Sequence, residues 1–209
     1  MPIVLNGSGT VSGISAGGLP DGIIQAADLA SGVGGKILQV KQTVKTSYYT
    51  NSSIDTVYDV TGVSVDITPT SSSNKIYVTI TGAYSNSSDE AYGQLFLART
   101  ISGTTVNDLL LGDSSGSASR AAFPMVIRSS GAQHGAWAFA IQYLDSPNTT
   151  SAITYKLQGR GRYPNDFAIG IGGTYSTSDH NKTRVPTIIT AMEISAWVRL
   201  SYYIAVVMV

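Results

Sequence analysis

The feature that most constrains the fold is a two-residue alternation of apolar and polar side chains that recurs along the chain. Five segments carry it: residues 38–44, 76–81, 136–143, 153–157 and 192–201. Successive side chains of a β-strand point to opposite faces of its sheet, so this alternation is typical of half-buried strands. No segment of the body keeps a helical spacing for more than a turn or two. The sequence therefore predicts an all-β fold.

Two of these segments also predict which side chains share a face. In residues 38–44, Leu38, Val40, Gln42 and Val44 face away from Gln39, Lys41 and Thr43. In residues 192–201, one face holds Met192, Ile194, Ala196, Val198 and Leu200, and the other holds Glu193, Ser195, Trp197, Arg199 and Ser201. We expect the apolar side of each strand to be the buried one, and the second strand to continue into the apolar C-terminal segment.

Clusters of Ser, Thr, Asn, Asp, Gly and Pro separate the alternating segments. They lie at residues 68–74, 85–89, 112–116, 145–148 and 174–181. Turn clusters at this spacing divide the body into roughly eight to ten short strands. A β-sandwich of the jelly-roll type accommodates such a series, and we predict one for residues 36–196.

The first 35 residues differ from this body. They are rich in Gly, they contain no Lys or Arg, and Asp21 and Asp28 are their only charged side chains. Glycine loses the most backbone entropy on ordering and adds no side chain to a core. Residues 1–35 are therefore predicted to be an extended arm that orders against a partner, with a short helical turn at 23–31 capped by Asp21.

The last segment, residues 197–209, is almost wholly apolar but contains Arg199. It is shorter than the roughly 20 residues that a membrane-spanning helix needs. We expect it to be a buried or interface segment, and we expect no membrane insertion. The first residues lack the basic region and the apolar run of a secretory signal, so none is expected.

Charge and cysteine content exclude several classes of partner and site. The 13 basic residues balance the 13 acidic ones, and charged residues make up 12% of the chain. Nucleic-acid-binding domains carry a basic surface, which this composition does not provide, so no nucleic-acid partner is expected. The absence of Cys excludes disulfides and thiolate metal sites.

No motif supports catalysis. Two G-x-S-x-G matches occur, at residues 13–17 and 112–116, but neither is followed by a helix, as a nucleophile elbow requires. The two histidines, His134 and His180, are the only candidate imidazole bases. Residues 32–36 fail the phosphate-loop pattern, and the Asp179–His180 pair is a weak metal motif. We therefore predict no enzymatic activity, no metal site and no cofactor.

One segment favours ligand binding. Residues 146–165 contain no carboxylate but hold three cations with Tyr interleaved, and the candidate binding residues are Tyr155, Lys156, Arg160, Arg162 and Tyr163. Tyr and Arg can stack on sugars, and Arg can pair with phosphate. The alternative is a solvated edge strand that basic side chains protect from aggregation, and the sequence leaves both readings open.

Several pieces of the sequence, in order, resemble a known group of proteins. They are residues 3–14, 18–22 and 27–30 near the start, and residues 67–76, 143–147, 151–155 and 188–194 in the body. Together they resemble tail-fibre and virion-appendage proteins of bacteriophages, notably phages of cyanobacteria and marine bacteria. Residues 197–209 depart from the group, whose chains tend to stop soon after the step Met192-Glu193-Ile194.

The resemblance implies a homotrimeric virion protein whose N-terminal arm docks on the particle while a jelly-roll head projects outward. The docking or trimer positions would be Ile14, Leu19, Pro20, Asp21, Ile23 and Leu29. The partners would be other copies of the chain, tail, baseplate or capsid proteins, and host cell-surface polysaccharide bound by head loops. The alternative is a capsid decoration or cement protein with the same fold, which needs no receptor.

Overall fold

Eleven β-strands and no helix make up the part of the chain that the structure, a computed structural model, describes: residues 36–86, 90–128, 135–163, 169–174 and 183–196. The strands are β1 (Ile37–Lys45), β2 (Tyr49–Asn51), β3 (Tyr58–Ile67), β4 (Lys75–Asn86), β5 (Glu90–Ile101), β6 (Thr104–Val106), β7 (Phe123–Arg128), β8 (Trp137–Asp145), β9 (Ile153–Tyr163), β10 (Ile169–Ile171) and β11 (Thr187–Ile194). The all-β prediction is confirmed. The predictions for residues 1–35 and 197–209, including the six docking positions, lie outside the described residues.

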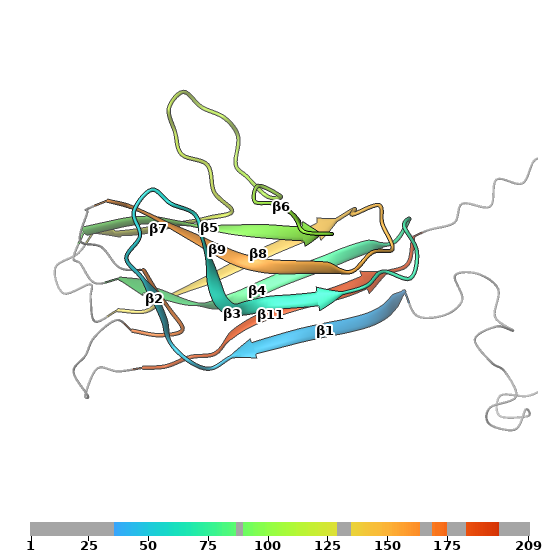
Figure 1. Cartoon of the computed structure of the whole chain (residues 1–209). Coiled ribbons are helices and arrows are strands. Elements are labelled where there is room, and N and C mark those ends of the chain that lie inside the picture. Colours follow the sequence, from blue (N-terminus) through green and yellow to red (C-terminus); the bar gives the residue numbers. More distant parts are fainter. Residues whose placement is uncertain (1–35, 87–89, 129–134, 164–168, 175–182, 197–209) are drawn as a thin grey trace, which may run out of the picture. The chain divides into compact units, whose positions relative to one another are not determined.

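The strands form two antiparallel sheets (Figure 1). Sheet A has the order β1-β11-β4-β10-β2, and β8 also pairs with β4. Sheet B has the order β3-β9-β5-β6, and β7 also pairs with β5. The predicted strands near residues 38–44, 76–81, 136–143 and 153–157 correspond to β1, β4, β8 and β9.

The core lies between the inner faces of the two sheets. From sheet A it receives Ile76, Val78 and Ile80 of β4, which are at most 1% exposed, and from sheet B it receives alternate residues of β5 and β9, namely Leu95, Leu97, Ile153, Tyr155 and Leu157. Burying one such aliphatic side chain contributes about 1.5–3 kcal/mol to stability. The period of two in the sequence thus gave the inner face of these central strands correctly.

The expectation for β1 was wrong in one respect. The side chains share faces as predicted, but the apolar side of β1 is the exposed one: Val40 is 54% exposed and Val44 49%. β1 is the edge strand of sheet A, and its polar side, with Gln39 and Thr43, turns toward the interior. This polar side lies next to β3 and its following loop, and Gln39 satisfies its amide there by donating to the Thr68 carbonyl and to Glu193.

β11 also differs from the prediction. The strand ends at Ile194, and its core side is that of Ile189, Ala191 and Glu193, each 0% exposed, whereas Met192 is half-buried on the outer side. The buried Glu193 is stabilised by four donated hydrogen bonds of 2.6–2.8 Å: to Oε1 from the Thr70 amide and hydroxyl and from Asn74 Nδ2, and to Oε2 from Gln39 Nε2.

The electrostatic balance at Glu193 explains why a carboxylate can close this end of the core. Burial raises its pKa, but the hydrogen bonds from Asn74, Gln39 and Thr70 together outweigh that effect, so the pKa lies below its usual value. Glu193 is therefore ionised at neutral pH and ties the loop between β3 and β4 to β11.

A second buried carboxylate joins the two sheets. Asp145 at the end of β8 is 3% exposed and accepts two hydrogen bonds from Arg99 Nη1, at 2.8 and 2.7 Å, and one from the Tyr155 hydroxyl at 2.6 Å. Arg99 and Tyr155 belong to sheet B, and Asp145 to sheet A. The sequence had assigned Asp145 only to a turn, because a lone Asp before Ser-Pro gives no sign of its partners.

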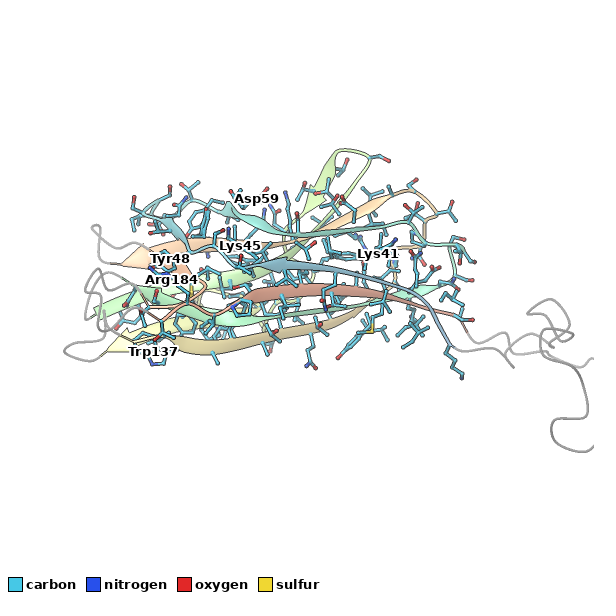
Figure 2. All side chains as sticks on the ribbon, turned by 90° about the horizontal axis from the view of Figure 1, so that it is seen from below. Lys41, Lys45, Tyr48, Asp59, Trp137 and Arg184 are labelled. Atoms are coloured by element: carbon cyan, nitrogen blue, oxygen red, sulfur yellow. The ribbon has the colours of Figure 1, made fainter. Side chains whose placement is uncertain are left out.

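The other end of the sheets is closed by aromatic and basic side chains (Figure 2). The Arg184 guanidinium lies 4.2 Å from the ring centroid of Tyr48, and the Tyr48 and Ser85 hydroxyl oxygens are 3.1 Å apart. Gly170 of β10 lies beneath them, where a Cβ would collide with the Tyr48 hydroxyl. Glycine at this position permits the close approach of Tyr48 to the sheet.

Candidate ligand-binding site on the outer face of sheet B

Strand β9 divides the predicted binding residues between the two faces of sheet B. Tyr155 points into the core and is 0% exposed, while Lys156, Arg160 and Arg162 lie on the outer face. The proposal of Tyr155 as a binding residue is therefore wrong: residues of odd and even number on one strand cannot share a surface. Tyr163 is the last residue of β9, and its side chain is outside the described set.

Lys156 is committed to partners on the neighbouring strand β3. Its Nζ lies 2.8 Å from Asp59 Oδ2, and Gln158 Nε2 donates to Asp59 Oδ1 at 2.7 Å. Burial raises the pKa of Asp59. The hydrogen bonds from Lys156 and Gln158 and the charge of Lys156 together outweigh this effect, so the pKa lies below its usual value. An open hollow of about 420 Å³ lies alongside, between Asp59, Gly62, Ser64, Thr100 and Lys156.

Arg160 is held against the sheet as well. Its Nε and Nη2 both donate to Gln94 Oε1, and its Cζ lies 5.4 Å from the ring centroid of Phe96. Burial and then the charge of Arg162 lower the pKa of the guanidinium, against a smaller opposite effect of Asp55. Its hydrogen bonds within the sheet make Arg160 a positioning residue for Gln94 more than a ligand contact.

Arg162 is the most accessible of the three cations. Its side chain is 42% exposed, and its Nη1 donates to Asp55 Oδ1 at 2.9 Å, where Asp55 is 62% exposed. Exposed ion pairs contribute only about 0–1 kcal/mol. An anionic group on a ligand can therefore replace Asp55 at little cost.

A second hollow, of about 350 Å³, opens beside Arg162. Its lining combines an aromatic ring, apolar side chains and polar groups from four parts of the fold: Tyr92, Gly93 and Gln94 of β5, Ser119 of the loop before β7, Pro124 and Val126 of β7, and Arg162 of β9. Val126 is 50% exposed. An aromatic ring beside a guanidinium and a hydroxyl is a combination that suits sugar rings bearing hydroxyl or carboxylate groups. We call this the Tyr92–Arg162 hollow.

The sequence identified one side of this hollow. Arg162 was selected as part of a basic, Tyr-containing run, but Tyr92, Ser119, Pro124 and Val126 lie 36–70 residues earlier in the chain. They reach Arg162 because β5 pairs with both β7 and β9. Pairing of strands so distant in sequence leaves no local signal in a single chain.

The outer face of sheet A has the opposite character. Across β1, β11, β4 and β8, one row consists of Val40, Met192, Tyr77 and Leu144, and another of Val44, Ile188, Thr81 and Ala140. Val40, Val44 and Leu144 are each about half exposed, and Ile37 and Leu38 at the start of β1 are exposed to a similar extent. A polar but uncharged row, Gln42, Thr190, Thr79 and Gln142, lies between these two rows. We call the outward side of these four strands the apolar face, because its exposed large side chains are apolar.

Ser114 of the second G-x-S-x-G match lies in the irregular loop between β6 and β7, with no helix after it. His134 and His180 lie outside the described residues. In the described part of the chain, no three His, Asp or Glu side chains group as metal ligands.

Comparisons with known proteins do not assign the chain to a family. A scan against protein-family models finds no match, and no curated protein matches the sequence. Across the ranges that the structure describes, no helix is long and apolar enough to cross a membrane.

Proposed function

We propose that this protein is a homotrimeric virion structural protein, a phage tail fibre or appendage, that attaches to the particle through residues 1–35. Its head, residues 36–196, binds a host-surface glycan, and no step of the function is enzymatic. The observation that carries the proposal is the division of the head into one apolar face and one charged face with a hollow.

The strand order supports a jelly-roll head. The long strands follow the orders β1-β11-β4-β8 in one sheet and β3-β9-β5-β7 in the other. The first long strand therefore lies beside the last, and the chain passes between sheets as it proceeds. Jelly-roll domains have eight strands in two sheets of this kind and occur in viral capsid and lectin domains.

The apolar face supports assembly. Ile37, Leu38, Val40, Val44 and Leu144 are all about half exposed on this one face, and exposed apolar side chains that gather on one side of a domain often mark interaction sites. The low charge of the chain, 12%, and its zero net charge fit subunits that pack against each other and against a particle. The resemblance of residues 3–14 and 18–22 to phage appendage proteins supports a particle as the final partner.

The Tyr92–Arg162 hollow supports glycan binding. It lies on the face opposite the apolar one, so a ligand can reach it in an assembled head. Arg162 and Ser119 can bind polar groups of the sugar, and Tyr92 offers a ring. The ion pair of Arg162 with Asp55 is exposed to solvent and therefore weak, so Arg162 can pair with a ligand carboxylate instead. We therefore expect acidic polysaccharides to bind more tightly than neutral ones.

Imaging of labelled particles tests the virion proposal. We expect the label on the tail or on an appendage, and deletion of residues 1–35 should abolish attachment while the head remains folded. A label distributed over the capsid shell would instead support the alternative, a decoration or cement protein. A label absent from purified particles would contradict both.

Binding of polysaccharides tests the ligand site. We expect the protein to retain polygalacturonate more strongly than dextran, and Arg162→Ala to lose most of this difference. Lys36→Ala, which removes an exposed cation that precedes β1, is the matched control and should bind normally. Equal loss in both variants would indicate a non-specific charge effect and would contradict a site at the hollow.

A further inference from the structure

We infer that the apolar face of sheet A lines the three-fold axis of the trimer, with the β1 edge of one subunit against the β8 edge of the next. The occupant of the face is therefore a second copy of this chain. This inference rests on the proposed trimer and adds which surface builds it. The charged outer face of sheet B then points away from the axis.

The distribution of charge favours a second copy as the occupant. Among the outward residues of β1, β11, β4 and β8, all of which the structure describes, Lys75 is the one charged side chain, and it lies at the end of the face where its Nζ donates to Ser146 Oγ at 2.7 Å. Residues beside a rotation axis approach copies of themselves, so any charge there would repel its own image. A face without charge along its middle satisfies this condition.

The two outer faces of the head differ in the way that this arrangement requires. On sheet B, Lys156 pairs with Asp59 and Arg162 with Asp55, which is the pattern of a solvated surface. On sheet A, the corresponding outward positions are Val40, Val44 and Leu144, with Gln42 donating to Thr190 at 3.0 Å. Burial of the sheet A face therefore removes apolar side chains from water without removing a charged group, whereas burial of the sheet B face would desolvate its ion pairs.

The size of the face fits a subunit interface. Four strands spaced by about 4.8 Å and eight residues long at about 3.3 Å per residue give a flat area of roughly 500 Å². Because the side chains protrude from the sheet, the solvent-accessible area of the face is larger than this flat area. The three faces around one axis together present roughly 1,500 Å² of flat area, against the about 1,200–2,000 Å² of total surface that a standard two-chain interface buries.

The register of the strands determines which residues of two subunits meet. Val40 on β1 and Leu144 on β8 lie in one row, because Val40 pairs with Met192, Met192 with Tyr77, and Tyr77 with Leu144. When three such faces surround an axis that runs along the strands, the β1 edge of each subunit adjoins the β8 edge of its neighbour. Val40 of one copy then packs against Leu144 of the next.

The ends of the described chain fit this geometry. Ile37 pairs with Ile194, so the strands that begin and end the head do so at the same end of the apolar face. Three-fold packing therefore brings the three connections to residues 1–35 together at one end of the axis. A common exit for three arms suits attachment to a single site on a particle.

Charge substitutions on the full chain test the interface. By light scattering we expect the wild type to have the mass of three chains, and Val40→Glu or Leu144→Glu to fall to the 21.9 kDa of one chain. The matched control is Val57→Glu, an exposed valine in the loop before β3, which should remain trimeric. Circular dichroism should show unchanged strand content in all three variants, because each new charge lies at an exposed position.

The absence of Cys permits a second, independent test. Within one subunit Val40 and Leu144 are separated by β11 and β4, hence by roughly 14 Å, which is too far for a disulfide. Oxidation of the double variant Val40→Cys/Leu144→Cys should therefore yield a covalent trimer on a denaturing gel. Each single variant lacks the partner cysteine and should run as a single chain on the same denaturing gel.

The outcomes separate this inference from the proposed function. A wild-type chain that is monomeric overturns both the trimer and its interface. A wild-type trimer that persists in Val40→Glu and Leu144→Glu, with no covalent trimer from the double cysteine variant, overturns the interface while the trimeric appendage stands. Dissociation by both charges but not by Val57→Glu, with the covalent trimer, supports the inference.

Discussion

Replacement of Glu193 by Gln tests how one buried carboxylate holds the end of the sandwich together. Glu193→Gln keeps the shape of the side chain and removes its charge. The amide oxygen can take the place of Oε1 and still accept from Thr70 and Asn74. The amide nitrogen then takes the place of Oε2 and faces Gln39 Nε2, which is also a donor.

The structure gives the magnitude of the loss. Gln39 cannot turn its amide to solve the conflict without giving up its 2.7 Å hydrogen bond to the Thr68 carbonyl. At least one buried donor therefore loses its acceptor, at about 1–3 kcal/mol, and the remaining hydrogen bonds lose the assistance of the charge. We expect the free energy of unfolding at pH 7 to fall by about 2–4 kcal/mol.

The effect should depend on pH in a defined direction. The pKa of Glu193 is lower in the folded state than the about 4.3 of an unfolded chain, so its stabilising effect is complete above that value and is lost as the pH falls through the folded pKa. Protonated Glu193 resembles Gln. The difference in unfolding free energy between wild type and variant should therefore shrink toward zero in acid.

Urea unfolding at pH 7 and in acid, at one protein concentration, measures this difference. Asp108→Asn, at an exposed loop position, is the control and should change stability by less than about 0.5 kcal/mol at either pH. A Glu193→Gln variant as stable as the wild type at pH 7, or a difference that is independent of pH, would refute the assignment of Glu193 as an ionised, hydrogen-bonded core residue.

Three further predictions concern the core and its edges. Asp145→Ala leaves the Arg99 guanidinium, whose side chain is 18% exposed, without its carboxylate. Chemical denaturation should show an unfolding free energy lower by about 3–5 kcal/mol, and the double variant Arg99→Met/Asp145→Leu should recover most of this loss. Tyr155→Phe removes the hydroxyl that donates to Asp145 and should lower the free energy of unfolding by about 1–2 kcal/mol. Retention on polygalacturonate should not change, since the ring is buried, and weakened retention would restore Tyr155 as a binding residue. Gly170→Ala should displace Tyr48 and lower the thermal midpoint, at a cost of about 1–3 kcal/mol, whereas Gly112→Ala, where a Cβ meets open space, should be nearly neutral.

The alternation of side chains determined the fold class and the inner faces of the central strands. Ile76, Val78 and Ile80 of β4, and Ile153, Tyr155 and Leu157 of β9, are buried as their spacing predicts. Alternation has a physical cause within a single strand, because neighbouring side chains point to opposite faces. It therefore reports which residues share a face without any knowledge of the other strands.

Tertiary structure alone decided which face of an edge strand is buried and which residues meet. The pattern of β1 is as regular as that of β4, yet its apolar side is exposed, because only the position of β1 at the edge of sheet A determines what covers it. Glu193, Asp145 and the Tyr92–Arg162 hollow each depend on partners from distant segments. Hydrogen bonds and surfaces formed between strands far apart in sequence are set by sheet pairing, and the local pattern of one chain does not encode which strands pair.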